Sequence, residues 1–133
     1  EQDIYFENFV YPQFDKKTPD QILFSFFKKK TFIGYGGLVH INWNEKNAEI
    51  SFLIETKMER LFFISCWDTF LILIERVAKN IKINKIFTYA YDIRPKIYEV
   101  LENQGFSQEK RLKDKVIIDG VYKDVLIHSK IVL

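Results

Sequence analysis

The sequence has little of the residue types that mark a secreted, membrane-spanning or metal-binding protein. Of its 133 residues only Cys66 is a cysteine, and two are histidines. A single cysteine cannot form a disulfide within the chain, which favours a reducing compartment and predicts a cytoplasmic protein. No apolar run is as long as a membrane span, so no membrane partner is predicted. The scattered His, Cys and acidic residues show no metal-ligand spacing, which predicts no metal site.

Charge of one sign is also lacking, because 20 basic residues face 18 acidic ones and the net charge is +2. Such a balance gives no support for nucleic acid as a partner, although the many aromatic residues would suit a nucleic-acid-binding module. Repeats, long linkers and low-complexity tracts are absent as well. The length fits one domain with one core, over residues 1–133. The chain starts with the polar Glu1-Gln2-Asp3 and without methionine, and we expect its N-terminal part to be truncated.

The composition that remains is apolar and rich in rings. Hydrophobic residues make up 47% of the chain, with 13 Phe and 7 Tyr, which predicts a folded protein with a sheet-rich core. Residues 1–11 are interpreted as the end of a helix, from apolar residues on one side. Alternating and apolar runs predict strands over 22–27, 31–41, 48–54, 85–91, 112–118 and 121–129. Asp119-Gly120 between the last two is a strong hairpin signal.

Two helices complete the pattern. Apolar residues at three- and four-residue spacing predict a helix over 65–81, with Ser65 and Asp68 as its capping box. A second helix is predicted between Pro95 and Gly105. Because a helical crossover connects strand 48–54 to strand 85–91, these two strands are predicted to be parallel. The expected fold is α/β (α+β): a mixed, mostly antiparallel twisted sheet with one parallel β-α-β crossover and helices on both faces.

Five segments then suggest a family. They are Ile33-Gly34-Tyr35-Gly36-Gly37-Leu38, Ala48-Glu49-Ile50-Ser51-Phe52, Lys85-Ile86, Val100 to Phe106 and Asp119 to Val125. In order and spacing they resemble the GNAT superfamily of N-acetyltransferases, with most likeness to the branch that acetylates ribosomal-protein N-termini and amino sugars. The resemblance implies acetyl-coenzyme A (acetyl-CoA) as co-substrate and an acyltransferase activity.

Three departures from the family pattern stand out. Most of the strand and helices that usually precede the first hairpin is missing. The coenzyme-binding loop usually contains two small residues, but the matching segment from Arg60 to Cys66 has no glycine. A tyrosine that many members carry four residues before the Gly-Phe pair is Leu101 here. These departures motivate a second hypothesis, a degenerate acyl-CoA-binding or interaction domain without turnover.

Glu49 is the first candidate for the base that the resemblance implies. An attacking amine must lose a proton, and a carboxylate half-buried among Ala48, Ile50 and Phe52 would be a stronger base than a solvated one. The alternative is a solvated glutamate on the outer face of a strand. For the acid that protonates the leaving thiolate, Tyr98 is ranked first from its place on the second helix. Tyr89 and Tyr91 are the alternatives, and each tyrosine could instead be a core or rim aromatic residue.

The resemblance also places the coenzyme. Its pantetheine arm is expected to pair with the backbone of Phe52, Leu53 and Ile54 in the manner of an added strand. Its pyrophosphate is expected at the N-terminus of helix 65–81, where free N–H groups and the helix dipole attract an anion. The residues expected there are Phe63, Ile64, Ser65 and Cys66.

Two arginines are further candidates for coenzyme contacts, Arg60 and Arg94, with a solvated side chain and a local ion pair as the respective alternatives. His40 and His128 could face the acceptor, although a strand histidine is more often a packed residue. The acceptor is expected to be a small-molecule amine, an amino sugar included, or a protein N-terminus. Exposed strand edges make a homodimer possible.

Overall fold

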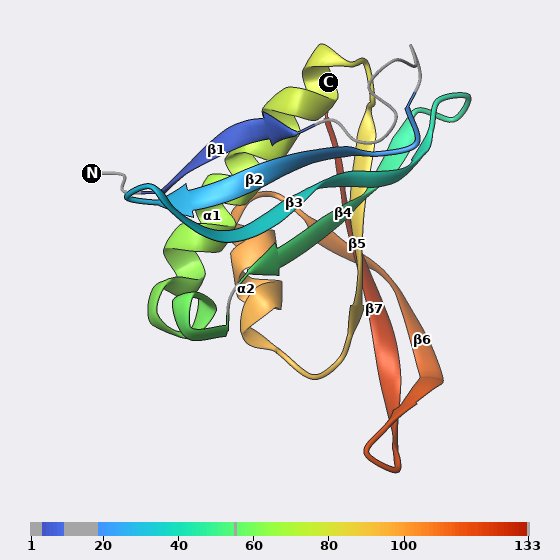
Figure 1. Ribbon diagram of the computed structural model, residues 1–133. Coiled ribbons are helices and arrows are strands. Elements are labelled where there is room, and N and C mark those ends of the chain that lie inside the picture. The colour runs from blue at the N-terminus through green and yellow to red at the C-terminus, as the bar shows by residue number, and fades with distance from the viewer. Residues whose placement is uncertain (1–3, 10–18, 55, 133) are drawn as a thin grey trace.

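The computed structural model describes residues 4–9, 19–54 and 56–132, and describes side chains for most of these. The described chain forms one seven-stranded sheet and two helices (Figure 1). The strands are β1 (Ile4–Phe9), β2 (Ile22–Lys28), β3 (Thr31–Asn42), β4 (Asn47–Ile54), β5 (Lys85–Tyr91), β6 (Ser107–Ile118) and β7 (Val121–Ile131). The helices are α1 (Thr56–Asn80), which connects β4 to β5, and α2 (Lys96–Asn103), which follows β5.

The strand order in the sheet is β1-β2-β3-β4-β5-β7-β6. Every neighbouring pair is antiparallel except β4 and β5, which are parallel because the helical crossover α1 joins them. The mixed sheet predicted from the sequence is confirmed. The last hairpin is confirmed too: Asp119 and Gly120 both have positive φ, 51° and 78°, as a two-residue hairpin turn of this kind requires.

Alternate residues of β3 and β4 build the core under α1. Leu38 pairs with Ile50 in the sheet, and both are buried against the helix. Next along β4, the Phe52 ring stacks on Phe70 of α1, with centroids 4.2 Å apart and planes at 6°. Gly36 lies opposite Phe52, and a Cβ at this glycine would come within 2.8 Å of the Phe70 ring. The missing side chain at Gly36 therefore lets α1 pack closely against the sheet.

Both helices pack on the same face of the sheet, which corrects the expectation that helices cover both faces. Buried residues of α1 (Phe70, Ile74) and of α2 (Val100, Leu101) belong to one core cluster, together with sheet residues such as Ile86. Lys130 of β7 also joins the helices, since its Nζ lies 2.5 Å from Glu75 Oε1 in α1 and 2.7 Å from the Gln104 carbonyl oxygen. In the described part of the chain, the opposite face carries no helix.

The expected helix end at residues 1–11 is also wrong. Residues Ile4–Phe9 form an edge strand that pairs antiparallel with β2, from Ile4 opposite Lys28 to Phe9 opposite Leu23. The apolar spacing of this short segment was compatible with either structure. Pairing with a strand more than a dozen residues away decided between them, which a local pattern does not reveal.

The start of the long helix differs from the prediction of 65–81. Helix α1 begins at Thr56 and runs to Asn80, with a break at Phe62, whose φ and ψ are −130° and 37°. Ser65 is thus inside the helix, three residues after the break, and the predicted capping box is wrong because a cap residue must precede the helical backbone. Asp68 instead accepts a hydrogen bond from Gln104 Nε2 at 3.2 Å.

Candidate functional site

The parallel strands β4 and β5 separate after only three paired positions. The pairs are Asn47 with Lys85, Ala48 with Ile86 and Glu49 with Phe87, although β4 continues to Ile54 and β5 to Tyr91. Figure 1 shows the two strands diverging beyond this point. A cleft of about 360 Å³ lies there, lined by Glu49, Ile50, Ser51, Phe52, Leu53, Trp67, Thr88, Tyr89, Ala90, Tyr91, Ile93, Arg94 and Ile97.

Each strand is held apart by its other neighbour. The β3 ladder keeps β4 in place as far as Ile54, which pairs with Gly34, and the β7 ladder keeps β5 in place as far as Tyr91. From the helix side, the described rings of Phe52 and Trp67 line this cleft without filling it. Phe52 stacks on Phe70, and Phe62 packs against a separate cluster that contains Phe26 and Cys66. Beyond Glu49 and Phe87, the edges of β4 and β5 that face each other therefore pair with no described strand.

Glu49 stands where the strands part, and its carboxylate is half-buried, with 24% of the side chain exposed. Its Oε1 lies 2.8 Å from Nδ1 of His40. His40 has a φ of 48° at a bulge where the pairing of β3 with β4 shifts, between Val39 and Asn42. Strict alternation would put Glu49 and His40 on opposite faces of the sheet, so the bulge brings them together. The sequence did not predict this contact.

Thr88 is the first residue of β5 beyond the last pair with β4, and sequence reasoning did not single it out. Its side chain is buried, 7% exposed, and its Oγ1 makes no hydrogen bond with any described residue. Thr88 lines the cleft at the end where the strands part. A buried hydroxyl without a hydrogen bond costs free energy of folding, so this position needs an explanation. One sequence signal could have identified Thr88: it is a polar residue two positions after Ile86, on the side of strand 85–91 that alternation predicts to be buried.

His128 is opposite Thr88 on β7 and is 1% exposed. Neither ring nitrogen makes a hydrogen bond within the described residues, and the Nε2 atom is 3.7 Å from Glu102 Oε2. Burial lowers the pKa of His128, so the ring is neutral at pH 7. The ring stacks on Tyr98, at a centroid distance of 5.2 Å. His128 is therefore a packed residue, which was the alternative to an acceptor contact in the prediction from the sequence.

Tyr98, the predicted acid, is not among the residues that line the cleft. Its hydroxyl donates a hydrogen bond to Asp92 Oδ1 at 2.7 Å, and Asp92 also pairs with Arg111. Burial, together with the bond to Asp92, raises the pKa of Tyr98. Tyr89 and Tyr91 do line the cleft and are 40% and 47% exposed.

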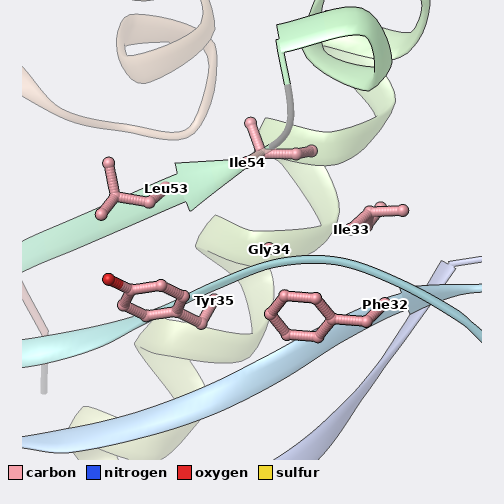
Figure 2. Close-up of a pocket in the computed structure, with 6 residues that line it drawn as sticks. All are labelled: Phe32, Ile33, Gly34, Tyr35, Leu53 and Ile54. Carbon is pink, nitrogen blue, oxygen red and sulfur yellow. The ribbon is translucent and has the colours of Figure 1, made fainter.

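The residues predicted to hold the coenzyme divide into two groups. Phe52, Leu53 and Arg94 line the cleft, which brings them together with Glu49. Ile54 lies beyond it, in a neighbouring pocket that Figure 2 shows.

The second group lies along α1, near its break at Phe62. Ile64 and Ser65 are exposed, and Cys66 is fully buried. Arg60 and Phe63 have helical backbone, and their side chains lie outside the described part of the structure. After the break, the N–H groups and the dipole of the resumed helix point toward its start, which suits an anion.

The described residues contain neither a metal-ligand cluster nor a helix suited to cross a membrane. No group of three or more His, Cys, Asp or Glu side chains in this part of the chain is arranged to hold a metal ion. Neither described helix is both long and apolar enough to cross a membrane.

Comparisons with known proteins agree with this geometry. The model of a family described as "Acetyltransferase (GNAT) domain" matches residues 1–127. Mutant forms of the spermidine/spermine N-acetyltransferase of Vibrio cholerae have a similar structure, with a TM-score of 0.76 at 22% identity over 86% of this chain and 69% of that chain. A protein described as a candidate phosphinothricin N-acetyltransferase gives 0.74 at 16% identity, over 90% and 77%. A comparison with curated protein sequences found no relative.

Proposed function

The chain belongs to the GNAT family of acetyltransferases, and from this premise we propose that it transfers an acetyl group from acetyl-CoA to a primary amine. The open edge of β4 beyond Glu49, next to a cleft, is the observation that supports the proposal most. One neighbour is a spermidine/spermine N-acetyltransferase and the other is described as a candidate phosphinothricin N-acetyltransferase, which favours a small-molecule acceptor. Amino sugars and protein N-termini, the acceptors of the branch that the sequence resembles, are further candidates.

The described residues fit a coenzyme on three counts. The unpaired edge of β4 offers backbone N–H and C=O groups from Phe52 to Ile54 to an extended amide-containing arm. The break at Phe62 offers helical N–H groups for a pyrophosphate, in a segment that has no glycine. Arg94 lines the cleft and adds a positive charge. Bound acetyl-CoA would supply an activated acetyl thioester.

Glu49 is the proposed base. Its Oε atoms would accept the amine proton, directly or through a water molecule, because an ammonium ion has no lone pair for attack. His40, 2.8 Å from Oε1 and 79% exposed, then fixes the carboxylate and connects it to solvent. Thr88 is proposed to donate its unpaired hydroxyl to the acetyl carbonyl oxygen at the narrow end of the cleft.

The proton for the departing thiolate needs a donor in the cleft. Tyr98 stays a prediction, and its hydroxyl is already engaged by Asp92. Its raised pKa also makes it a weaker acid than an ordinary tyrosine. We therefore propose Tyr89 or Tyr91, which line the cleft, as the donor in its place.

The test combines calorimetry with an assay of thiol release. We expect saturable binding of acetyl-CoA, and release of coenzyme A that depends on the added amine. Competition by coenzyme A without the acetyl group should weaken the binding of acetyl-CoA. If acetyl-CoA does not bind at millimolar concentration, the proposed function is wrong.

A second candidate, binding of acyl-CoA without turnover, is favoured by the glycine-free segment 60–66 and by the engaged Tyr98 hydroxyl. Binding without thiol release over a broad amine panel would support it. A cytoplasmic location remains part of the proposal and fits the buried free thiol of Cys66. A homodimer remains a prediction, which the oligomeric state in solution would test.

A further inference from the structure

A second hollow adjoins the cleft, on the face of the sheet that neither described helix covers. Its volume is about 660 Å³ and it is lined by Gln21, Leu23, Ser25, Phe32, Tyr35, Val39, Ser51 and Leu53. We call it the sheet-face pocket. Ser51 and Leu53 line both the pocket and the cleft. Val39 of the pocket is directly opposite Glu49 in the β3–β4 ladder. The sheet-face pocket therefore begins beside the proposed base.

The lining of the sheet-face pocket is neutral. None of these eight residues is Asp, Glu, Lys, Arg or His, and most of the exposed side-chain area around them is apolar. Phe32 and Leu53 are each 56% exposed and Tyr35 is 40% exposed, which is unusual for large apolar side chains unless something covers them. These three residues also line a further hollow of about 310 Å³, and Figure 2 shows how their side chains lie.

We propose that the sheet-face pocket binds the acceptor, and that the acceptor is a primary amine on an apolar alkyl or aromatic body. This inference rests on the proposed function. The amine would lie at Glu49, and the body would extend along β4 past Ser51 to Leu53 and the rings of Phe32 and Tyr35. From Glu49 to Leu53 the strand rises about 13 Å, enough for a ring on a chain of several carbons.

The same lining disfavours a polyamine such as the spermidine of the structural neighbours. A second ammonium ion would leave water for a surface without a carboxylate among the described lining residues. Burying an unpaired charge costs more than the aromatic rings return through cation–π contacts. An apolar body of the same length loses nothing in this transfer and gains from it.

The experiment compares two acceptors that share a four-carbon arm ending in a primary amine, 4-phenylbutylamine and spermidine. Release of coenzyme A is followed at saturating acetyl-CoA, and the calorimetric Kd for acetyl-CoA reports that each variant is folded. We expect kcat/KM for 4-phenylbutylamine to exceed that for spermidine by about tenfold or more. Tyr35→Glu should lower the former value by about tenfold and raise the latter. The control Tyr122→Glu, at a tyrosine 62% exposed on another strand, should change neither by more than about twofold.

The outcomes separate the inference from the proposed function. Faster acetylation of spermidine, or an equal effect of Tyr35→Glu and Tyr122→Glu, would overturn the assignment of the pocket and leave the acetyltransferase activity intact. Bound acetyl-CoA without acetylation of any amine would overturn both. A tenfold preference that Tyr35→Glu reverses, at unchanged Kd for acetyl-CoA, would establish the acceptor class.

Discussion

The side chains on the two faces of β4 differ in chemistry, although residues of the two faces alternate along the strand. Ile50 and Phe52 face α1 and belong to the aromatic and aliphatic core. Glu49, Ser51 and Leu53 face the other way. Residues of both faces line the cleft, but only Ser51 and Leu53 of β4 also line the sheet-face pocket. The period of two in a strand thus lets one short segment anchor a helix and carry a reactive site. We therefore expect variants in the core to affect stability and variants in the cleft to affect the reaction.

The largest effect is expected on the core face. Phe70→Ala removes the ring that stacks on Phe52 and is fully buried, which should cost about 3–5 kcal/mol of unfolding free energy. Urea denaturation measures the loss. Ile72→Ala in the same helix, at a side chain 51% exposed, is the control and should cost under about 1 kcal/mol. A small loss at Phe70 would mean that α1 is not held to β4 by these rings.

On the cleft face, Glu49→Gln should lower kcat by about 100-fold, because the amide has no basic oxygen to accept the amine proton. The Kd for acetyl-CoA should stay within about twofold, since the coenzyme is proposed to contact β4 through its backbone. Steady-state rates at pH 7 and calorimetry provide both numbers. Unchanged turnover at neutral pH would remove Glu49 from the mechanism.

Thr88→Val should lower kcat by about tenfold and raise the unfolding free energy by about 1 kcal/mol, since it deletes an unpaired buried hydroxyl. Thr88→Ser keeps the hydroxyl and should restore most of the rate. The opposite signs for rate and stability distinguish a contact with the acyl group from a structural role. A valine variant that is both fully active and more stable would leave Thr88 without a part in the reaction.

The smallest effect on rate is expected at Tyr98. Tyr98→Phe should change kcat by less than about threefold, whereas loss of a general acid costs about 100-fold or more. Tyr89→Phe and Tyr91→Phe are the matched comparisons, and one of them should show the larger loss. If Tyr98→Phe has the largest loss of the three, the acid predicted from the sequence is correct.

The pH dependence of stability gives Tyr98 an independent measurement. Its pKa is raised in the folded protein, so its contribution to stability is complete below pH 10 and is lost as the pH rises further. The unfolding free energy of the wild type should therefore fall more between pH 9 and pH 11 than that of Tyr98→Phe. Chemical denaturation at the two pH values measures the difference, and equal slopes would contradict the raised pKa that burial and the hydrogen bond to Asp92 give Tyr98.

Local signals were enough for part of this protein. Strand 85–91 and the Asp119-Gly120 turn were predicted with their observed bounds, because alternation and turn chemistry act within a few residues. Resemblance to the family selected Glu49, Phe52, Leu53 and Arg94; the structure places the four around one cleft, and their roles stay predictions.

Only the tertiary structure decided the rest. Strand β1 exists because β2 pairs with it, and both helices share one face because their apolar sides meet in one core. Three features depend on contacts between separate residues of the chain. They are the point where β4 and β5 part, the hydrogen bond between His40 and Glu49, and the hydrogen bond from Tyr98 to Asp92. Periodicity states which side of an element is apolar, and the packing of separate elements determines what that side meets.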